Sequence, residues 1–152
     1  MLKEDDKKEL RVEFWKRFKH FSNIKKLKEK KPGKWIMNDT GIKQIQLKFD
    51  IDEQHAQAGI YIRTNNLDKR VELWDKIENL KNILEERIPH TLNWEVEYFI
   101  TDKRSISRVF AQLDNVNIYN KTCWKQVWNF FYEVMNPIED ILLEYKDYLK
   151  YS

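Results

Sequence analysis

Aromatic rings and cations alternate along two segments of the chain in a pattern that suits binding. Tyr61 and Arg63 are two residues apart, and so are Arg108 and Phe110. Residues two apart on a β-strand point to the same face of the sheet, so each pair shares a face if its segment is a strand. Rings stack on unpaired bases while cations hold phosphates, which is the chemistry of single-stranded nucleic-acid binding. Tyr61, Arg63 and Arg108 are therefore candidate binding residues.

A second interpretation explains the same residues without a ligand. Arg63 and Arg108 can pair with Glu95 and Glu97 across neighbouring strands. Carboxylates on that face would also repel phosphate. The sequence leaves both interpretations open.

The N-terminal segment carries an excess of positive charge. Residues 1–34 hold 13 Lys or Arg against 6 Asp or Glu, whereas residues 35–152 hold 15 against 19. The densest part is a run of six lysines: Lys25, Lys26, Lys28, Lys30, Lys31 and Lys34. Such a run attracts nucleic acid, an acidic protein or an anionic lipid surface. A solvated helix end followed by a loop is the alternative explanation.

A divergent or degenerate nuclease is the main enzymatic alternative. A nuclease core of the PD-(D/E)xK type needs carboxylates that converge on Mg²⁺ and a lysine near the attacking water. The nearest match is Asp39 followed by Gln46 and Lys48. Gln46 stands where the second carboxylate belongs, and Asp39 is expected in a turn. The sequence therefore favours a non-enzymatic protein.

The remaining chemistry-bearing residues form no familiar pattern in the sequence. His20, His55 and His90 lack the spacing of metal ligands, and Cys123 is the single cysteine. We expect no metal, no cofactor and no internal disulfide. The charged N-terminus lacks the apolar stretch of a signal peptide, and no apolar run reaches membrane-spanning length. We therefore expect a cytoplasmic protein with no membrane partner.

Hydrophobic periodicity predicts the elements that must position these residues. Ile45, Leu47, Phe49 and Ile51 alternate strictly with polar residues, which is typical of a strand with one buried face. Helical spacing of apolar residues predicts a first helix around Phe14 and a second that Pro89 stops. The predicted strands cover residues 35–37, 44–51, 56–63, 92–100 and 105–113. The expected fold is α+β in the order α-β-β-β-α-β-β-α, with a mainly antiparallel five-stranded sheet packed against helices.

A long C-terminal helix is predicted over residues 122–150. Its apolar residues follow a four-three repeat: Trp124, Trp128, Phe131, Met135, Ile138, Leu142, Tyr145 and Leu149. Pro137 is expected to kink or split it. This apolar stripe can pack on the chain's own sheet. Alternatively, the far end of the helix can pack against a second copy of the chain in a homodimer. The third hypothesis is therefore a structural module that dimerises through this helix.

The length is that of one domain, residues 1–152. Within it we expect a basic N-terminal helix and loop over 1–34, two β-hairpin units around a central helix over 35–113, and the C-terminal helix over 120–152.

Several local motifs together resemble a known family. They are Ile60-Tyr61-Ile62-Arg63 leading into residues 69–84, then Trp94-Glu95, Ser107-Arg108-Val109 and the Trp/Phe-rich final helix. With them the chain resembles domain of unknown function 4268 (DUF4268), in its short stand-alone bacterial form, over nearly its whole length. The family has no established activity. Its longer members carry this domain behind an endonuclease-like domain, so the resemblance implies a setting in DNA handling or restriction-like defence. We expect a binding or accessory domain whose partner is nucleic acid or a nucleic-acid-handling protein.

Overall fold

A four-stranded antiparallel sheet and five α-helices form the part of the chain that the structure describes. The computed structural model describes residues 2–31, 35 and 39–151. The strand order across the sheet is β1-β2-β4-β3, and every neighbouring pair is antiparallel. In chain order the elements are α1 (Glu4–Lys28), β1 (Ile45–Ile51), β2 (His55–Ile62), α2 (Leu67–Asn79), α3 (Lys81–Arg87), β3 (Leu92–Phe99), β4 (Ser105–Asp114), a short 3₁₀ turn (Lys121–Cys123), α4 (Trp124–Glu144) and α5 (Lys146–Lys150).

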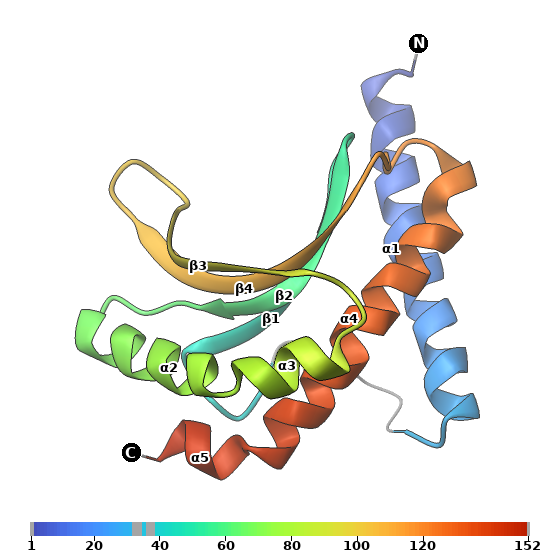
Figure 1. Ribbon diagram of the computed structural model, residues 1–152. Coiled ribbons are helices and arrows are strands. Elements are labelled where there is room, and N and C mark those ends of the chain that lie inside the picture. Colours follow the sequence, from blue (N-terminus) through green and yellow to red (C-terminus); the bar gives the residue numbers. More distant parts are fainter. Residues whose placement is uncertain (1, 32–34, 36–38, 152) are drawn as a thin grey trace.

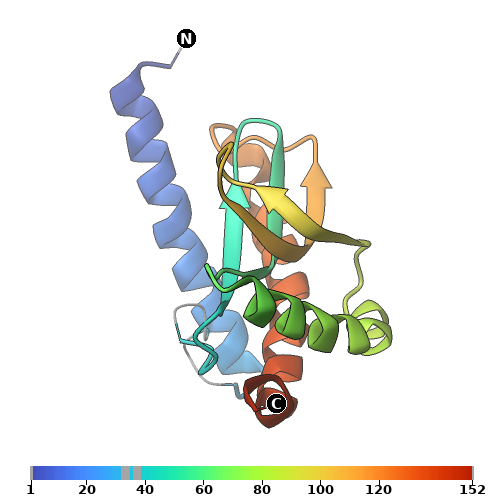
Figure 2. The same cartoon turned by 90° about the vertical axis from the view of Figure 1, so that its left-hand side faces the viewer.

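The sheet is strongly curved, and the helices lie on its convex side (Figures 1 and 2). Alternate strand residues such as Leu47, Ile60 and Val109 point to that side and are buried with Phe131 of α4. The alternation that the sequence shows on β1 is therefore the alternation between core and solvent. Helix α1 packs on α4 and reaches the core at the β1 edge, where the ring of Phe18 lies 5.0 Å from that of Phe49.

The prediction of five strands is wrong. Trp35, the start of the predicted first strand, belongs to no strand, and residues 36–38 lie outside the described residues. The ring of Trp35 instead packs edge-on against Phe49 and Tyr132. A strand here was predicted from an aromatic residue in an apolar run, but packing of that ring into the core overrides local β-propensity.

Two of the three predicted helices are divided. The second breaks at Leu80, whose N–H bonds back to Ile77 O at 2.9 Å, and this separates α2 from α3. The last breaks at Tyr145 rather than at Pro137, which α4 accommodates within its length. The predicted four-three repeat nevertheless holds, because seven of its eight side chains are buried in this chain's own core and Tyr145 packs against it.

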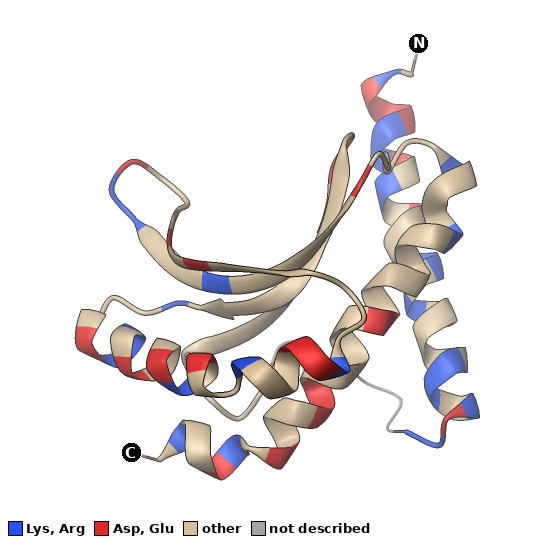
Figure 3. Cartoon of the chain, viewed as in Figure 1, with Lys and Arg blue, Asp and Glu red and all other residues tan. Residues whose placement is uncertain are grey.

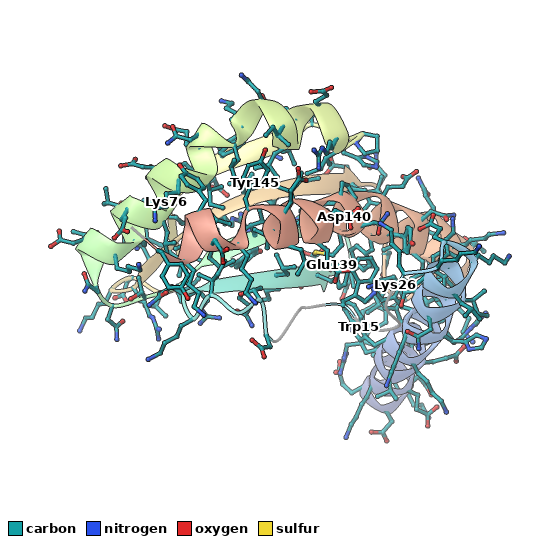
Figure 4. All side chains as sticks on the ribbon, turned by 90° about the horizontal axis from the view of Figure 1, so that it is seen from below. Trp15, Lys26, Lys76, Glu139, Asp140 and Tyr145 are labelled. Carbon is teal, nitrogen blue, oxygen red and sulfur yellow. The ribbon has the colours of Figure 1, made fainter. Side chains whose placement is uncertain are left out.

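A buried ion pair joins the end of α1 to α4. Lys26 is 0% exposed and its Nζ lies 3.1 Å from Oε1 of Glu139, which is 3% exposed. The ammonium also lies 4.0 Å from the ring centroid of Trp35. Figure 4 shows Lys26 and Glu139 where the two helices meet. A charge taken out of water is costly unless it is paired, so this contact fixes how α1 docks.

We predict that Glu139→Gln destabilises the fold, because it leaves the buried ammonium of Lys26 without this carboxylate. The free energy of unfolding should fall by about 3 kcal/mol. Glu86→Gln, at an exposed position of α3, is the control and should change it by less than about 0.5 kcal/mol. Urea denaturation followed by circular dichroism measures both. A Glu139→Gln protein as stable as the control would contradict the role given to the pair.

Candidate functional site

The concave face of the sheet holds the candidate binding residues. It faces away from the core, and no helix in the described part of the chain covers it (Figures 1 and 2). Strand register and alternation place on it the residue Arg63, just after β2, and these strand residues: Gln46, Lys48, Asp50, Gln57, Gly59, Tyr61, Glu95, Tyr98, Ile106, Arg108, Phe110 and Gln112.

Arg108 lies at the centre of the concave face and is enclosed by its neighbours. Its guanidinium carbon is 3.6 Å from the ring centroid of Tyr98 and 3.9 Å from that of Phe110. Nε donates to Oε1 of Glu95 at 2.7 Å, and Nη2 lies 2.7 Å from the same oxygen. Cation–π contact and a charge-assisted hydrogen bond together hold the guanidinium in one place.

The remaining donor group of Arg108 links it to β2. Nη1 donates to Gln57 Oε1 at 3.2 Å and to the hydroxyl of Tyr61 at 3.1 Å. Gln57 in turn donates to Gln112, so a hydrogen-bond chain crosses the face. Arg108 is only 6% exposed. It therefore organises the face, and its guanidinium is not available to a partner while these contacts persist.

Gly59 makes room for this arrangement. It pairs with Phe110 across the β2–β4 ladder. A Cβ at Gly59 would lie 2.1 Å from Val109 O and 2.7 Å from Phe110 Cα. The close approach of β4 to β2 at this point thus requires a residue without a side chain.

Lys48 and Arg63 are the exposed cations among the strand-face candidates. Lys48 Nζ lies 5.4 Å from the ring centroid of Tyr61, and Arg63 Nη1 donates weakly to Gln46 Oε1 at 3.4 Å. Neither side chain forms an ion pair among the described residues. Both therefore keep their charge available at the surface, although the exposed Asp50 shares the face.

A β-bulge changes which β3 residues reach the concave face. Strict alternation predicts Glu97 and Phe99 there, but the register shifts between Glu95 and Tyr98. The bulge brings Tyr98 onto the concave face, opposite Ile106, and directs Glu97 toward Arg70 of α2 at 3.9 Å. Of the two acid partners considered from the sequence, only Glu95 pairs with Arg108, and Glu97 pairs with neither candidate arginine. No glycine or proline marks this bulge, so the sequence gives no signal for it.

The predicted basic run divides into internal and external lysines. Lys26 is buried, Lys31 bonds to Asn136 and Asp140 of α4 at 2.8 Å each, and Lys25 lies 5.5 Å from the ring centroid of Tyr132. Lys28 and Lys30 are exposed, and Lys34 lies outside the described residues. Of the lysines of this run that the structure describes, Lys25, Lys26 and Lys31 therefore join the end of α1 to α4, and Lys28 and Lys30 present their charge at the surface.

Exposed lysines continue along the rest of α1, outside its apolar stripe. Lys8, Lys16 and Lys19 are exposed and form no ion pair among the described residues. Figure 3 shows basic segments recurring along this helix. Their spacing alone predicts a solvent-facing side, but only the packing of α1 on α4 distinguishes these lysines from Lys26.

The residues of the nuclease hypothesis do not share one environment. Asp39 is exposed in the loop before β1 and accepts a hydrogen bond from the N–H of Gly41 at 3.0 Å. Gln46 and Lys48 lie on the concave face of β1, where they contact Arg63 and Tyr61. Within the described residues, no three His, Cys, Asp or Glu side chains lie close enough together to hold a metal ion.

Comparison with known families gives one result. A model of the family described as "Domain of unknown function (DUF4268)" matches residues 10–146. The chain belongs to this family. The DUF4268 match includes Lys26, the whole sheet and nearly all of the α4 stripe, which are the parts that define the fold and the concave face. No curated protein and no solved structure matches the chain. In the described part of the chain, none of the helices is both long enough and apolar enough to cross a membrane.

We predict that Arg108→Lys destabilises the fold even though it keeps the charge. Lysine lacks the planar group that lies between Tyr98 and Phe110, and it lacks the forked donors that reach Glu95. The free energy of unfolding should fall by about 2 kcal/mol. Arg63→Lys, on the same face but exposed, should stay within about 0.5 kcal/mol of the wild type. Equal effects of the two substitutions in urea denaturation would contradict the central position of Arg108.

The ionisation of Tyr61 supplies a pH-dependent test. Burial raises the pKa of Tyr61 above its ordinary value of 10.0, although the hydrogen bond from Arg108 opposes this. The stability that the neutral phenol contributes is therefore complete below its ordinary pKa and is lost as the pH rises past it. Tyr61→Phe should be less stable than the wild type at neutral pH, by about 1 kcal/mol for the lost hydrogen bond. The difference in unfolding free energy between Tyr61→Phe and the wild type should disappear at alkaline pH. For Tyr151→Phe, at an exposed position, the difference from the wild type should not change with pH in this way.

Proposed function

We propose that this chain is a non-enzymatic, single-domain binding protein that contacts nucleic acid through the concave face of its sheet. The observation that carries the proposal is the pair Lys48 and Arg63. Both are exposed cations, Lys48 lies in β1 and Arg63 directly follows β2, and neither is neutralised by an ion pair among the described residues. Cations on an open sheet face attract phosphate whatever the base sequence.

The proposed contact is mainly electrostatic. The guanidinium of Arg108 already covers one face of the Tyr98 ring and one face of the Phe110 ring. Lys48 and Arg63 instead contact the phosphates, and the half-buried Tyr98 contributes its exposed edge. Asp50 and Glu95 on the same face limit the affinity, which suits a protein that binds without strong sequence preference.

Helix α1 adds positive charge beside this face. It stands along the β1 edge of the sheet (Figure 2), and Lys7 reaches Glu53 at the tip of the β1–β2 hairpin at 3.9 Å. Lys8, Lys16 and Lys19 thereby increase the local attraction for phosphate without forming the primary site. The association of longer DUF4268 members with an endonuclease-like domain fits an accessory role in a nucleic-acid-handling, restriction-like system.

A binding titration tests the proposal. Fluorescence anisotropy with a labelled single-stranded oligonucleotide should show affinity that falls steeply as salt is raised. The double variant Lys48→Gln/Arg63→Gln should bind about tenfold more weakly. The slope of log affinity against log salt concentration should be smaller in magnitude by about 1 for each cation removed. Lys125→Gln/Lys150→Gln removes the same charge from two exposed positions on α4 and α5 and is the matched control.

Three outcomes would contradict the proposal. They are salt-independent binding, an equal loss in the control, and absence of binding by the wild type at low salt. Cleavage of the oligonucleotide in Mg²⁺ that Lys48→Ala abolishes would support the nuclease hypothesis instead.

A further inference from the structure

A cleft of about 310 Å³ lies between the β3–β4 turn and the segment that leads into α2. Its walls come from parts of the chain that are far apart in the sequence, such as Arg70 and Ser105, which are 35 residues apart, so only the fold brings them together. The lining residues that matter here are Thr64, Asn65, Arg70, Glu97, Lys103 and Arg104.

Arg70 supplies a fixed cation to this cleft. It is only 9% exposed, and its Nη1 donates to the carbonyl and the hydroxyl of Ser105 at 2.7 and 3.0 Å. Its Nη2 lies 3.9 Å from Glu97, which is beyond hydrogen-bond distance. The guanidinium is therefore held in position while one of its nitrogens retains donor capacity.

Lys103 and Arg104 supply two further cations from the opposite wall. Both are exposed, and their side chains form no hydrogen bond or ion pair among the described residues. Figure 3 shows both basic and acidic residues at this turn, and Asp102 directly precedes Lys103 in the sequence. Glu97 is the one carboxylate in the lining, so three cations face a single anion.

We infer that this cleft binds a phosphate monoester, in particular the terminal phosphate of a nucleic-acid strand that lies on the concave face. The inference rests on the proposed function, which it deepens. Arg63 of the concave face directly precedes Thr64 of the cleft in the chain, so the cleft lies close to the end of the proposed binding face. A terminal phosphate carries nearly two charges near neutral pH, whereas an internal phosphodiester carries one. Guanidinium groups also match the geometry of phosphate oxygens.

The first experiment compares oligonucleotides of one sequence that end in a 5′-phosphate, a 3′-phosphate or hydroxyl groups only. The wild type should bind one of the phosphorylated strands about tenfold more tightly than the hydroxyl-ended strand. Lys103→Gln/Arg104→Gln should lose this preference while it still binds the hydroxyl-ended strand. Lys125→Gln/Lys150→Gln should keep the preference. Equal binding of all three strands by the wild type would overturn the inference and leave the proposed function standing.

The second experiment uses inorganic phosphate, and it separates the cleft from the concave face. In nuclear magnetic resonance spectra of the wild type, added phosphate should shift the amide signals of Asn65 and Ser105 in a saturable way. Glu97→Gln should reach saturation at a lower phosphate concentration, because its affinity for phosphate is higher. Lys103→Gln/Arg104→Gln should show no such shifts. If these shifts appear but no strand binds, the cleft binds a phosphate group that is not part of a strand, and the proposed function fails. If phosphate produces no saturable shift at these residues, the inference is overturned.

Discussion

The buried guanidinium of Arg108 determines what the concave face presents to a partner. It covers one face each of Tyr98 and Phe110, and it takes up the carboxylate of Glu95. The two rings and the carboxylate therefore contact Arg108 within the sheet. Gly59 allows β4 to approach β2 closely enough for this arrangement to form. What remains at the surface is the charge of Lys48 and Arg63. A partner on this face therefore meets cations more than flat aromatic surfaces.

The same division between internal and external cations recurs elsewhere in the chain. Lys26 and Lys31 bind acidic residues of α4 and hold α1 beside the sheet, whereas Lys8, Lys16 and Lys19 on the same helix face solvent. Arg70 likewise anchors the β3–β4 turn through Ser105, which leaves Lys103 and Arg104 exposed across the cleft. In each region a buried cation fixes the scaffold on which exposed cations are displayed. The net charge of a segment thus overstates the charge available for binding.

The sequence predicts most of the fold and only part of the site. Alternation in β1, β2 and β4 and the four-three repeat of α4 follow from burial of one face, which is a local and periodic property. Trp35, where the sequence predicts the start of a first strand, belongs to no strand because its ring packs in the core against Phe49 and Tyr132, which lie far along the chain. The sequence makes Arg108 a candidate binding residue, but it does not show that Tyr98, Phe110 and Glu95 enclose the guanidinium, because those contacts form only when β3 and β4 pair. The bulge that brings Tyr98 over it carries no sequence signal, and neither does the cleft at Arg70.

The central claim is that nucleic acid contacts the concave face through its phosphates. The most direct test maps amide chemical-shift changes across the whole chain while a short hydroxyl-ended single strand is added at low salt. The account predicts that the largest changes fall on β1 and β2 around Lys48 and Arg63, with smaller ones along the outer side of α1, and that all of them diminish as salt is raised. Changes confined to α4 and α5, or changes that persist unaltered at high salt, would contradict it.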